Sequence, residues 1–391
     1  METLFTEGKV RMAPSGGAEW TMSVCGDLRV NREAHPRMTR RGWPAESVRN
    51  WLESDLVIAN LEAPVLQSAR RRGVSSVSRA FPMLAMPPAV LDRASEMGIT
   101  HLSLANNHIR DYGPDGLMET IEQARSHGLT VFGAGATRRA AARYALHRVQ
   151  GTRLALGAYA QNEDIAAGTR LPGANPLDPD RVVEDVVRMR KKADLVFLFL
   201  HDGYEFSEVP RVEFLRLCRR AAAAGAAAIF GHHPHVPHGL EMVGGCPVFY
   251  SLGNFLFRMN PHTGTEWAGK SFVPKLTFSG RKLCALELTP IYLDDDFIPR
   301  PSAGAERRKT LRHLRRLSGL LEEAKVDAAN RVFVKRHVWD VICDGVFDAG
   351  RRNDTTWLRE FKRSQILKDP YLKAMKDGAR LWRSGGDFPS F

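Results

Sequence analysis

The chain has 391 residues and a formal net charge of +12, and 43% of its residues are hydrophobic. This length suffices for one large domain or two domains with a substantial core, and the composition is typical of a globular protein. No apolar run approaches the roughly 20 residues that a membrane-spanning helix needs, and the N-terminal stretch lacks the basic and apolar regions of a secretion signal.

The five cysteines are scattered, odd in number and without a CxxC motif. They therefore indicate a reducing compartment, and we expect a cytoplasmic protein without a membrane anchor. Residues 303–391 carry 20 Lys and Arg against 12 Asp and Glu. Such a basic segment binds nucleic acid, an anionic surface or an acidic peptide, or is only a solvated face. Since no nucleic-acid-binding motif is present, a nucleic-acid partner is not expected.

In chain order, a flexible start of about 17 residues is followed by short apolar runs that alternate with amphipathic segments. The predicted strands are Trp20–Cys25, Leu56–Ala59, Ile99–Leu104, Leu129–Phe132, Asp194–Leu200, Ala226–Phe230 and Pro247–Ser251. The predicted helices are Glu46–Ser54, Pro88–Met97, Pro114–His127, Arg181–Lys192 and Glu213–Ala224. Two hairpins are predicted, Ala145–Val149 with Arg153–Ala160, and Val273–Phe278 with Lys282–Leu288. The alternation predicts an α/β fold with a largely parallel central sheet and antiparallel edges.

A change in composition near Pro299–Gly304 predicts a main domain over residues 1–302 and a basic, helical extension over residues 303–391. In the extension, leucines 311, 314, 317, 320 and 321 lie close to one face of a helix, and Trp357, Phe361 and Trp382 indicate further packed segments. The polar segment 68–78 is predicted to be an exposed loop.

Three histidines follow the apolar run Ala226–Phe230, namely His232, His233 and His235. Pro234 favours an extended backbone at His233, so His233 and His235 are expected to project to one side. Two imidazoles placed in this way suit a metal ion, although a polar loop with surface histidines would give the same pattern.

Polar residues also follow four other predicted strands, just past their C-terminal ends. They are Asp27, Glu62, Asn107 with His108, and His201. Because ligands bind at the C-terminal edge of open α/β sheets, we expect these side chains to converge on one site with the histidines. Carboxylates, an amide oxygen and imidazoles without a thiolate suit Mn, Fe, Zn, Mg or Ca.

The motifs GD at 26–27, NLE at 60–62, NNHxxDxG at 106–113, HxGxE at 201–205, GHHPHV at 231–236 and YSLGNF at 250–255 occur in this order. In this respect the chain resembles the CapA branch, named for a poly-γ-glutamate capsule protein, of the calcineurin-like metallophosphoesterase superfamily. The resemblance covers roughly residues 20–290 and leaves residues 303–391 outside. It implies the calcineurin-like fold, with central β-sheets flanked by helices, as a catalytic domain over residues 1–302.

The resemblance also implies roles for individual residues. The metal ligands would be Asp27, Glu62, Asn107, His201, His233 and His235, holding one or two divalent ions, with Ca, Mn or Mg as the first choices and Zn or Fe as alternatives. His108 would be the general acid or base, oriented by Asp111, and Asp27, His201 and His235 would also take part in catalysis. The substrate-binding candidates are Arg29, Asp202, Glu205, His232 and Asn254.

One position departs from the superfamily pattern. In the phosphoesterases of the superfamily the first motif is usually Asp-x-His, whereas in this chain Arg29 occupies the third position of that motif. Arginine does not deprotonate to bind a metal, so one of two metal positions loses a ligand and two-metal hydrolysis is disfavoured.

Three functions remain open. The first is epimerisation at the Cα of a peptide residue, as the resemblance to lasso-peptide epimerases of this branch implies, with a ribosomal precursor peptide as substrate and partner. The second is metal-assisted hydrolysis of a phosphoester or amide, and the third is binding of a peptide or polymer without catalysis.

Overall fold

The computed structural model describes residues 2–30, 35–38, 42–67, 84–161, 165–257 and 265–334. The chain divides into two compact units, one formed by Met1–Ser75 with Met83–Glu323 and one by Ser76–Pro82 with Ala324–Phe391. The second unit is described only at residues 324–334, which are helical. The predicted loop 68–78 and the aromatic residues Trp357, Phe361 and Trp382 lie outside the described residues. The fold and the site below belong to the first unit.

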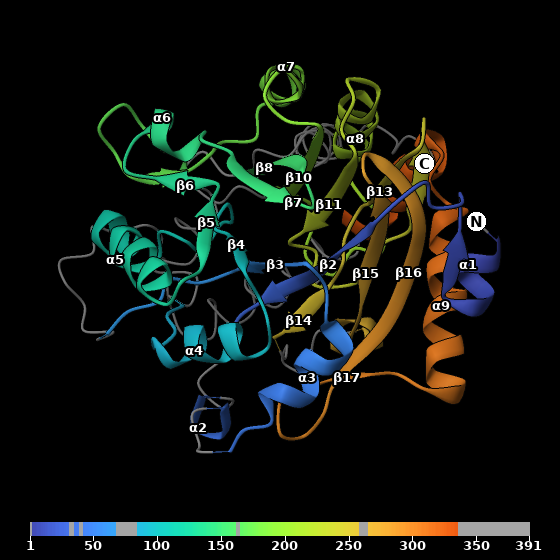
Figure 1. The fold of residues 1–391 in the computed structure, drawn as a ribbon, viewed down its shortest axis with the longest axis horizontal. Helices are drawn as coiled ribbons and strands as arrows, with labels where there is room; N and C mark the ends of the chain where they lie inside the picture. Colours follow the sequence, from blue (N-terminus) through green and yellow to red (C-terminus); the bar gives the residue numbers. More distant parts are fainter. Residues whose placement is uncertain are drawn as a thin grey trace, which may run out of the picture. The chain divides into compact units, whose positions relative to one another are not determined.

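The first unit contains a nine-stranded sheet (Figure 1). Its order is β1-β16-β15-β2-β3-β4-β5, with β14 beside β2 and β17 beside β16. Neighbours from β2 to β5 are parallel, while β1, β15 and β16 are antiparallel. The strands are β1 (Lys9–Arg11), β2 (Glu19–Leu28), β3 (Leu56–Leu61), β4 (His101–Ser103), β5 (Thr130–Phe132), β14 (Asn254–Leu256), β15 (Lys270–Ser279), β16 (Lys282–Leu293) and β17 (Pro299–Pro301).

A second sheet has six strands in the order β12-β13-β11-β10-β8-β7. Its middle strands are parallel and its edge strands β7 and β12 are antiparallel. The strands are β7 (Ala145–Val149), β8 (Thr152–Ala160), β10 (Leu195–His201), β11 (Ala228–His232), β12 (Leu240–Val243) and β13 (Cys246–Phe249). The short strands β6 (Ala134–Gly135) and β9 (Gly173–Ala174) form a separate pair.

The two sheets share one hydrophobic core. Phe197 on β10 makes edge-to-face contacts with Trp20 and Phe278 of the larger sheet, at centroid distances of 6.5 and 5.8 Å. Phe199, two residues further along β10, contacts Phe132 at 5.3 Å. Since side chains two apart share one face of a strand, this face of the smaller sheet packs against the larger sheet.

Helices cover the outer faces of the sheets. In Figure 1, α7 and α8 lie beside the smaller sheet, where they contact β10 and β11, and α5 contacts β5 of the larger sheet. The helices are α1 (Glu2–Glu7), α2 (His35–Met38), α3 (Ala45–Leu52), α4 (Ala89–Glu96), α5 (Gly113–Ser126), α6 (Arg138–Ala141), α7 (Pro179–Arg190), α8 (Val212–Ala223), the 3₁₀ turn η3 (Glu266–Gly269) and α9 (Gly304–Ser318). The predicted α/β fold, with central sheets flanked by helices, is confirmed.

Local sequence signals explain where helices begin. The side chain of Asp178 accepts hydrogen bonds from the backbone N–H groups of Asp180 and Arg181, and Pro179 occupies the first turn of α7. This satisfies donors that have no partner inside the helix. Pro114 takes the corresponding place in α5, and Gly128 follows the end of that helix with a φ of +75°.

Two regions differ from the sequence-based expectation. The N-terminal residues, expected to be flexible, form α1 and β1, because Leu4 and Phe5 are buried and β1 pairs with β16. Helix α9, expected to begin the C-terminal extension, belongs to the first compact unit, because Leu311 and Leu314 join its hydrophobic core. A separate role for residues 303–391 stays a prediction.

Two glycines allow the strands to approach closely beside the site. A Cβ atom on Gly26 would lie 1.9 Å from the carbonyl oxygen of Gly253, and one on Gly231 would lie 2.1 Å from that of Tyr250. Glycine is therefore required at both positions. The first contact places Asp27 directly beside the segment that leads into β14, since the Asp27 N–H donates to the Gly253 carbonyl at 3.0 Å.

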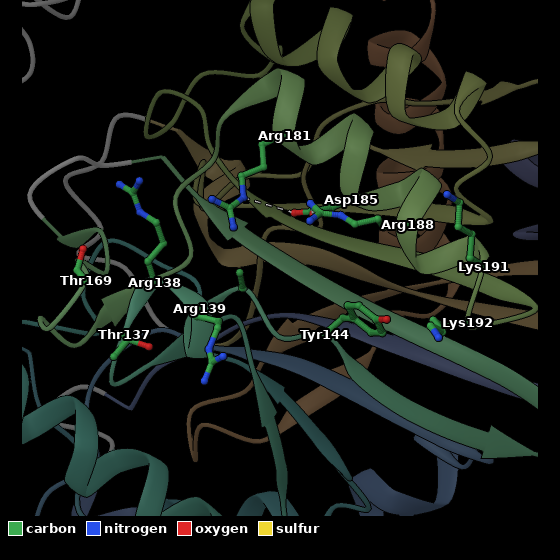
Figure 2. Close-up of a pocket in the computed structure, with 11 residues that line it drawn as sticks. Thr137, Arg138, Arg139, Tyr144, Thr169, Arg181, Asp185, Arg188, Lys191 and Lys192 are labelled. Atoms are coloured by element: carbon green, nitrogen blue, oxygen red, sulfur yellow. Dashed lines mark hydrogen bonds and ion pairs between the residues drawn. The ribbon is translucent and has the colours of Figure 1, made fainter.

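An open pocket of about 860 Å³ lies among α6, α7 and the chain that leads into β7 (Figure 2). Its walls are rich in Arg and Lys side chains. In the part of the chain that the structure describes, no helix has the length and apolar character needed to cross a bilayer.

Candidate functional site

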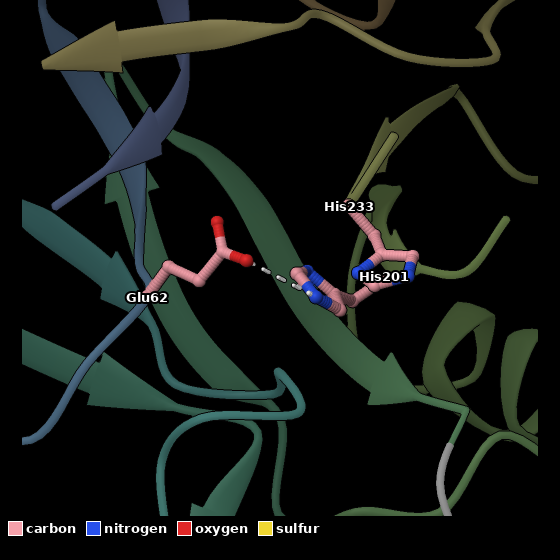
Figure 3. Close-up of side chains that lie close together, drawn as sticks. All are labelled: Glu62, His201 and His233. Carbon is pink, nitrogen blue, oxygen red and sulfur yellow. Dashed lines mark ion pairs between the residues drawn. The ribbon is translucent and has the colours of Figure 1, made fainter. Parts of the chain in front are cut away.

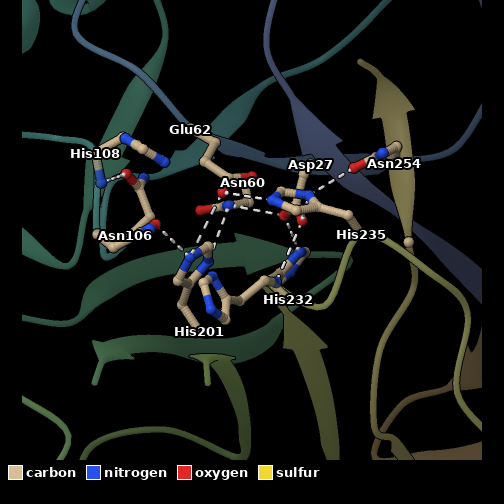
Figure 4. A network of polar contacts seen from close by, with 12 residues as sticks. Asp27, Asn60, Glu62, Asn106, His108, His201, His232, His235 and Asn254 are labelled. Atoms are coloured by element: carbon tan, nitrogen blue, oxygen red, sulfur yellow. Dashed lines mark hydrogen bonds and ion pairs between the residues drawn. The ribbon is translucent and has the colours of Figure 1, made fainter. Parts of the chain in front are cut away.

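The C-terminal ends of strands from both sheets meet at one place (Figure 4). Asp27 is the penultimate residue of β2, and Glu62 directly follows β3 in the larger sheet. His201 and His232 are the last residues of β10 and β11 in the smaller sheet. The imidazole Nδ1 of His232 lies 3.0 Å from Oδ1 of Asp27, so the two sheets deliver these residues to a common site.

Asp27 is fully buried and held by several donors. Its Oδ1 accepts hydrogen bonds from Asn60 Nδ2 at 2.8 Å and from His232 Nδ1, and its Oδ2 accepts one from the backbone N–H of His233 at 3.2 Å. Burial opposes ionisation, but the hydrogen bonds and charges of His232 and His235 outweigh it and hold the pKa of Asp27 well below its usual range. Asp27 is therefore a carboxylate, as a metal ligand must be.

Glu62 is also fully buried but lacks such donors. Its Oε1 lies 3.7 Å from His201 Nε2 and 3.5 Å from His235 Nε2, and neither carboxyl oxygen has a hydrogen-bond partner within the described residues. Burial, followed by the neighbouring charge of Asp27, raises the pKa of Glu62 well above its usual value. Two buried carboxyl groups side by side, one with orphaned oxygens, fit the coordination of a cation.

This arrangement predicts a stability effect in the metal-free protein. Because the folded-state pKa of Glu62 is raised, ionisation destabilises the fold progressively as pH rises above the unfolded value of 4.5. Glu62→Gln should remove this penalty and stabilise the chelator-treated protein by about 1–3 kcal/mol at pH 8, with a smaller gain at pH 5. Urea unfolding at both pH values checks this, and an equal gain at the two values would contradict the assignment.

Two of the cluster histidines, His232 and His233, present a buried ring nitrogen that makes no hydrogen bond with the described residues. Burial lowers the pKa of His233 to about 4. Burial, followed by the electrostatic effect of His233, holds the pKa of His201 well below its usual value. Both rings are therefore neutral. His235 donates from Nδ1 to Asn254 Oδ1 at 2.9 Å, which leaves Nε2 facing Glu62. Nε2 of His232 and Nδ1 of His233 are buried without a hydrogen-bond partner among the described residues.

Among the described residues, three groups of side chains could hold a metal ion, and within each group the ligand atoms lie within 4.8 Å of one another. They are Glu62–His201–His233, Asp27–Glu62–His235 and Glu205–His233–His235. Figure 3 shows the first, in which Glu62 and His201 face each other beside His233. Carboxylate and imidazole donors without a thiolate are compatible with a divalent metal ion, and Glu62 is shared between two of the groups.

The backbone of the histidine segment differs from the expectation. An extended backbone was expected at His233, but the φ angles of His233 and His235 are 100° and 60°. Positive φ is strained for residues other than glycine, by roughly 1–3 kcal/mol each. The strain is offset because the chain turns sharply at the end of β11, where the His233 N–H binds Asp27 and the Pro234 carbonyl accepts from the Phe206 N–H at 2.8 Å.

His108 lies in the loop after β4 and is partly exposed. Its Nδ1 is 3.0 Å from Asp111 Oδ2, and its backbone N–H donates to Asn106 Oδ1 at 3.1 Å. Neighbouring Asn107 directs its side-chain oxygen to His201 Nε2 at 2.9 Å. The loop therefore fixes the ring of His108 beside the buried cluster while leaving 18% of its side chain accessible.

The five substrate-binding candidates occupy different places. Glu205, His232 and Asn254 lie among the groups just described. The guanidinium of Arg29 stacks on the Phe257 ring at 4.3 Å, and although burial lowers its pKa, the charges of Glu62, Asp111 and Glu205 oppose that shift. Asp202 lies apart from the cluster, because its Oδ1 pairs with Arg211 Nε at 3.6 Å.

One polar residue of the cluster was missed by sequence reasoning. Asn60 donates to Asp27 and lies 3.4 Å from His201 Nδ1, so it contacts groups from both sheets. The spacing between Asn60 and Glu62 could have identified Asn60 in the sequence. Residues two apart on a strand share a face, and Glu62 follows Asn60 by two residues.

Comparisons with known proteins identify the family of the chain. The model of the family "Bacterial capsule synthesis protein PGA_cap" matches residues 21–259. The PGA biosynthesis protein CapA of Bacillus subtilis is 29% identical over 277 residues, which cover 69% of this chain and 70% of that protein. The capsule biosynthesis protein CapA of Bacillus anthracis is 31% identical over 248 residues, covering 61% and 59% respectively.

Among solved structures, the 5'-nucleotidase precursor from Thermus thermophilus matches with a TM-score of 0.40 and 16% identity, over 78% of this chain and 60% of that one. The resemblance to CapA-type proteins rests on the family match, which covers more than half of the chain and includes every residue of the cluster. The chain belongs to the bacterial capsule synthesis protein PGA_cap family.

Proposed function

We propose that this protein is a metal-dependent acid–base enzyme that epimerises a peptide residue by removing and returning the proton on its Cα. The single observation that carries this proposal is the position of Arg29, a fixed cation at the edge of the carboxylate and histidine cluster. It stands where two-metal phosphoesterases supply a histidine ligand. Arg29 cannot bind a metal, but its guanidinium can bind a substrate carboxylate in a bidentate manner.

The residues of the cluster fit a divalent ion. Asp27, Glu62, His201, His233 and His235 would hold it, since they present a charged carboxylate, two orphaned carboxyl oxygens, the neutral imidazoles of His201 and His233, and the Nε2 of His235 directed at Glu62. When bound, a divalent ion would polarise a substrate carbonyl and so acidify the adjacent C–H bond.

Proton transfer is assigned to His108. Asp111 engages its Nδ1 at 3.0 Å, which favours the tautomer with the proton on Nδ1 and leaves Nε2 to accept a proton from the substrate. Since 18% of the His108 side chain is accessible, a peptide can reach it. We assign the catalytic part of the chain to residues 1–302, and we propose that the basic segment 303–391 assists in holding a precursor peptide.

Metal-dependent hydrolysis of a phosphoester or amide is a second candidate, and one observation favours it. Glu62 takes part in two of the three groups of ligand atoms, which is the position of a carboxylate shared between two ions. A shared carboxylate is typical of two-metal sites that hydrolyse such bonds. Arg29 argues against this function, because arginine cannot supply the metal ligand that a histidine would supply at this position.

Heavy water distinguishes the two functions. Peptides with a free C-terminal carboxylate would be incubated in heavy water with the protein and each divalent metal in turn. Epimerisation adds one deuterium at an inverted residue and leaves the covalent structure unchanged, whereas amide hydrolysis yields shorter peptides. A phosphoester incubated with the same samples would release free phosphate if the protein is a phosphoesterase. Bound metal with neither outcome would refute both functions.

Arg29→Ala tests whether Arg29 binds the C-terminal carboxylate of the substrate. The loss of a charge-assisted, bidentate contact corresponds to about 1.5–3 kcal/mol, so KM should rise about 10- to 100-fold for peptides with a free C-terminus. Peptides with an amidated C-terminus should show little change. The exposed Arg143→Ala serves as the matched control. An equal loss with both kinds of peptide would remove Arg29 from carboxylate recognition.

A further inference from the structure

The pocket among α6, α7 and the chain before β7 is strongly cationic (Figure 2). Six of its lining residues are basic, namely Arg138, Arg139, Arg181, Arg188, Lys191 and Lys192. The first two come from α6 or its start, and the others come from α7 or the residues directly after it. Two parts of the chain more than 40 residues apart thus bring positive charges to one concave surface.

Only one acidic side chain, Asp185, lines this pocket among the described residues, and it is already engaged. Its Oδ2 accepts a hydrogen bond from the Tyr159 hydroxyl at 3.0 Å and lies 3.7 Å from Arg181 Nε. Its Oδ1 pairs with Arg188. Asp185 therefore orients two of the guanidinium groups and compensates a single charge, which leaves a net of five positive charges.

Several donors in the pocket have no protein partner. Within the described residues, no ion pair engages Arg139, Lys191 or Lys192. Nε of Arg181 is buried and makes no hydrogen bond with the described residues, although Asp185 Oδ2 lies 3.7 Å away as its ion-pair partner. Cations near the C-terminal end of α7 complement its dipole, but this does not explain why Arg138 and Arg139 line the same pocket. Like charges gathered in this way repel one another unless an anion lies between them.

We propose that this pocket binds a compact, multiply charged oxyanion of the polyphosphate class. Guanidinium groups match the oxygens of phosphate in a bidentate manner, and the hydroxyl groups of Thr137, Tyr144 and Thr169 line the same pocket as further donors. A volume of about 860 Å³ suits a small ligand. A polyphosphate concentrates several charges in this space, whereas an acidic peptide spreads one charge per residue along an extended chain.

The site is separate from the candidate metal centre, because none of the proposed metal ligands lines it. The inference therefore does not depend on the proposed function. Binding can be measured on the full chain in the presence of a chelator, which removes metal-dependent anion binding at the cluster.

Isothermal titration with tripolyphosphate tests the proposal. We expect saturable binding that weakens about tenfold or more in Arg139→Gln/Lys192→Gln, because two charge-assisted contacts are lost, and that weakens further as salt is raised. The matched control is Arg143→Gln/Arg190→Gln, which removes two exposed charges from neighbouring positions that do not line the pocket; it should bind within about twofold of the parent.

Three outcomes would overturn the proposal. They are the absence of saturable binding, an equal loss in the control variant, and tighter binding of an oligoglutamate peptide than of tripolyphosphate. The last result would assign the pocket to an acidic chain. Circular dichroism of both double variants verifies that they are folded, and the single variant Arg139→Gln, with an expected loss of several-fold, serves if the double variant does not fold.

Discussion

Asp27→Ala is expected to remove bound metal and turnover together. The pKa of Asp27 is held well below its usual range, so Asp27 provides a permanent negative charge for a cation. Without it, the stabilisation of developing negative charge in the transition state is lost, which corresponds to several kcal/mol and a fall in turnover of roughly a thousandfold or more. Metal content after desalting and turnover of the same sample check this.

Asp27→Ala also removes the hydrogen-bond acceptor of several buried donors, so its effect on folding must be distinguished from its effect on metal binding. Asn60 Nδ2, His232 Nδ1 and the His233 N–H would lose their partner, each at about 1–3 kcal/mol. Asp27→Asn keeps the shape and one acceptor and should fold while binding metal more weakly. Asp185→Asn, a buried carboxylate outside the cluster, should retain the metal. Full metal occupancy in Asp27→Ala would show that Asp27 is not a ligand.

His108→Ala is expected to abolish turnover while leaving metal content unchanged. His108 contacts Asp111 and Asn106 but belongs to none of the groups of ligand atoms that could hold a metal. General acid–base catalysis contributes about 10²- to 10⁴-fold, so a loss of that size is expected in kcat. Asp111→Asn should lower kcat less and alter its dependence on pH, since it disturbs the orientation and charge of the ring rather than removing it.

His127→Ala is the matched control for this experiment. His127 is another partly exposed histidine, at the end of α5, where its Nδ1 lies 2.7 Å from the Gln123 carbonyl oxygen. Its replacement should leave kcat unchanged. Activity retained by His108→Ala would exclude His108 from proton transfer, and loss of metal in that variant would assign it to the metal shell.

Most of the fold follows from local sequence. The predicted segments Pro88–Met97, Pro114–His127, Arg181–Lys192 and Glu213–Ala224 lie within two residues of α4, α5, α7 and α8 at each end. Apolar periodicity, Asp or Pro at helix starts and glycine at turns are all encoded within a few residues. Both predicted hairpins are present as β7 with β8 and β15 with β16.

The N-terminal segment could not be predicted in the same way. Helix α1 has six residues, too few to be stable alone. It forms because Leu4 and Phe5 are buried and because its neighbour β1 pairs with β16, nearly 280 residues away. Contacts of this kind depend on the complete fold and leave no local pattern.

The residues that meet at the site could be found from strand ends, but their orientation could not. His201 and Asp202 are adjacent, yet the first joins the cluster and the second pairs with Arg211. The left-handed backbone at His233 and His235 has no signal in the sequence, since Pro234 favours the opposite conformation for His233. The cationic pocket depends on the approach of α6 to α7, which only the folded chain reveals.

The central claim is that the buried carboxylate and histidine cluster holds a divalent metal. The most direct test is to strip the full chain with a chelator, load it in turn with Ca, Mg, Mn, Zn and Fe(II), and quantify the metal retained after desalting. We predict that at least one ion is retained at about one or two equivalents per chain and that Asp27→Ala loses it. Retention of none of these ions, or equal retention by Asp27→Ala, would contradict the account.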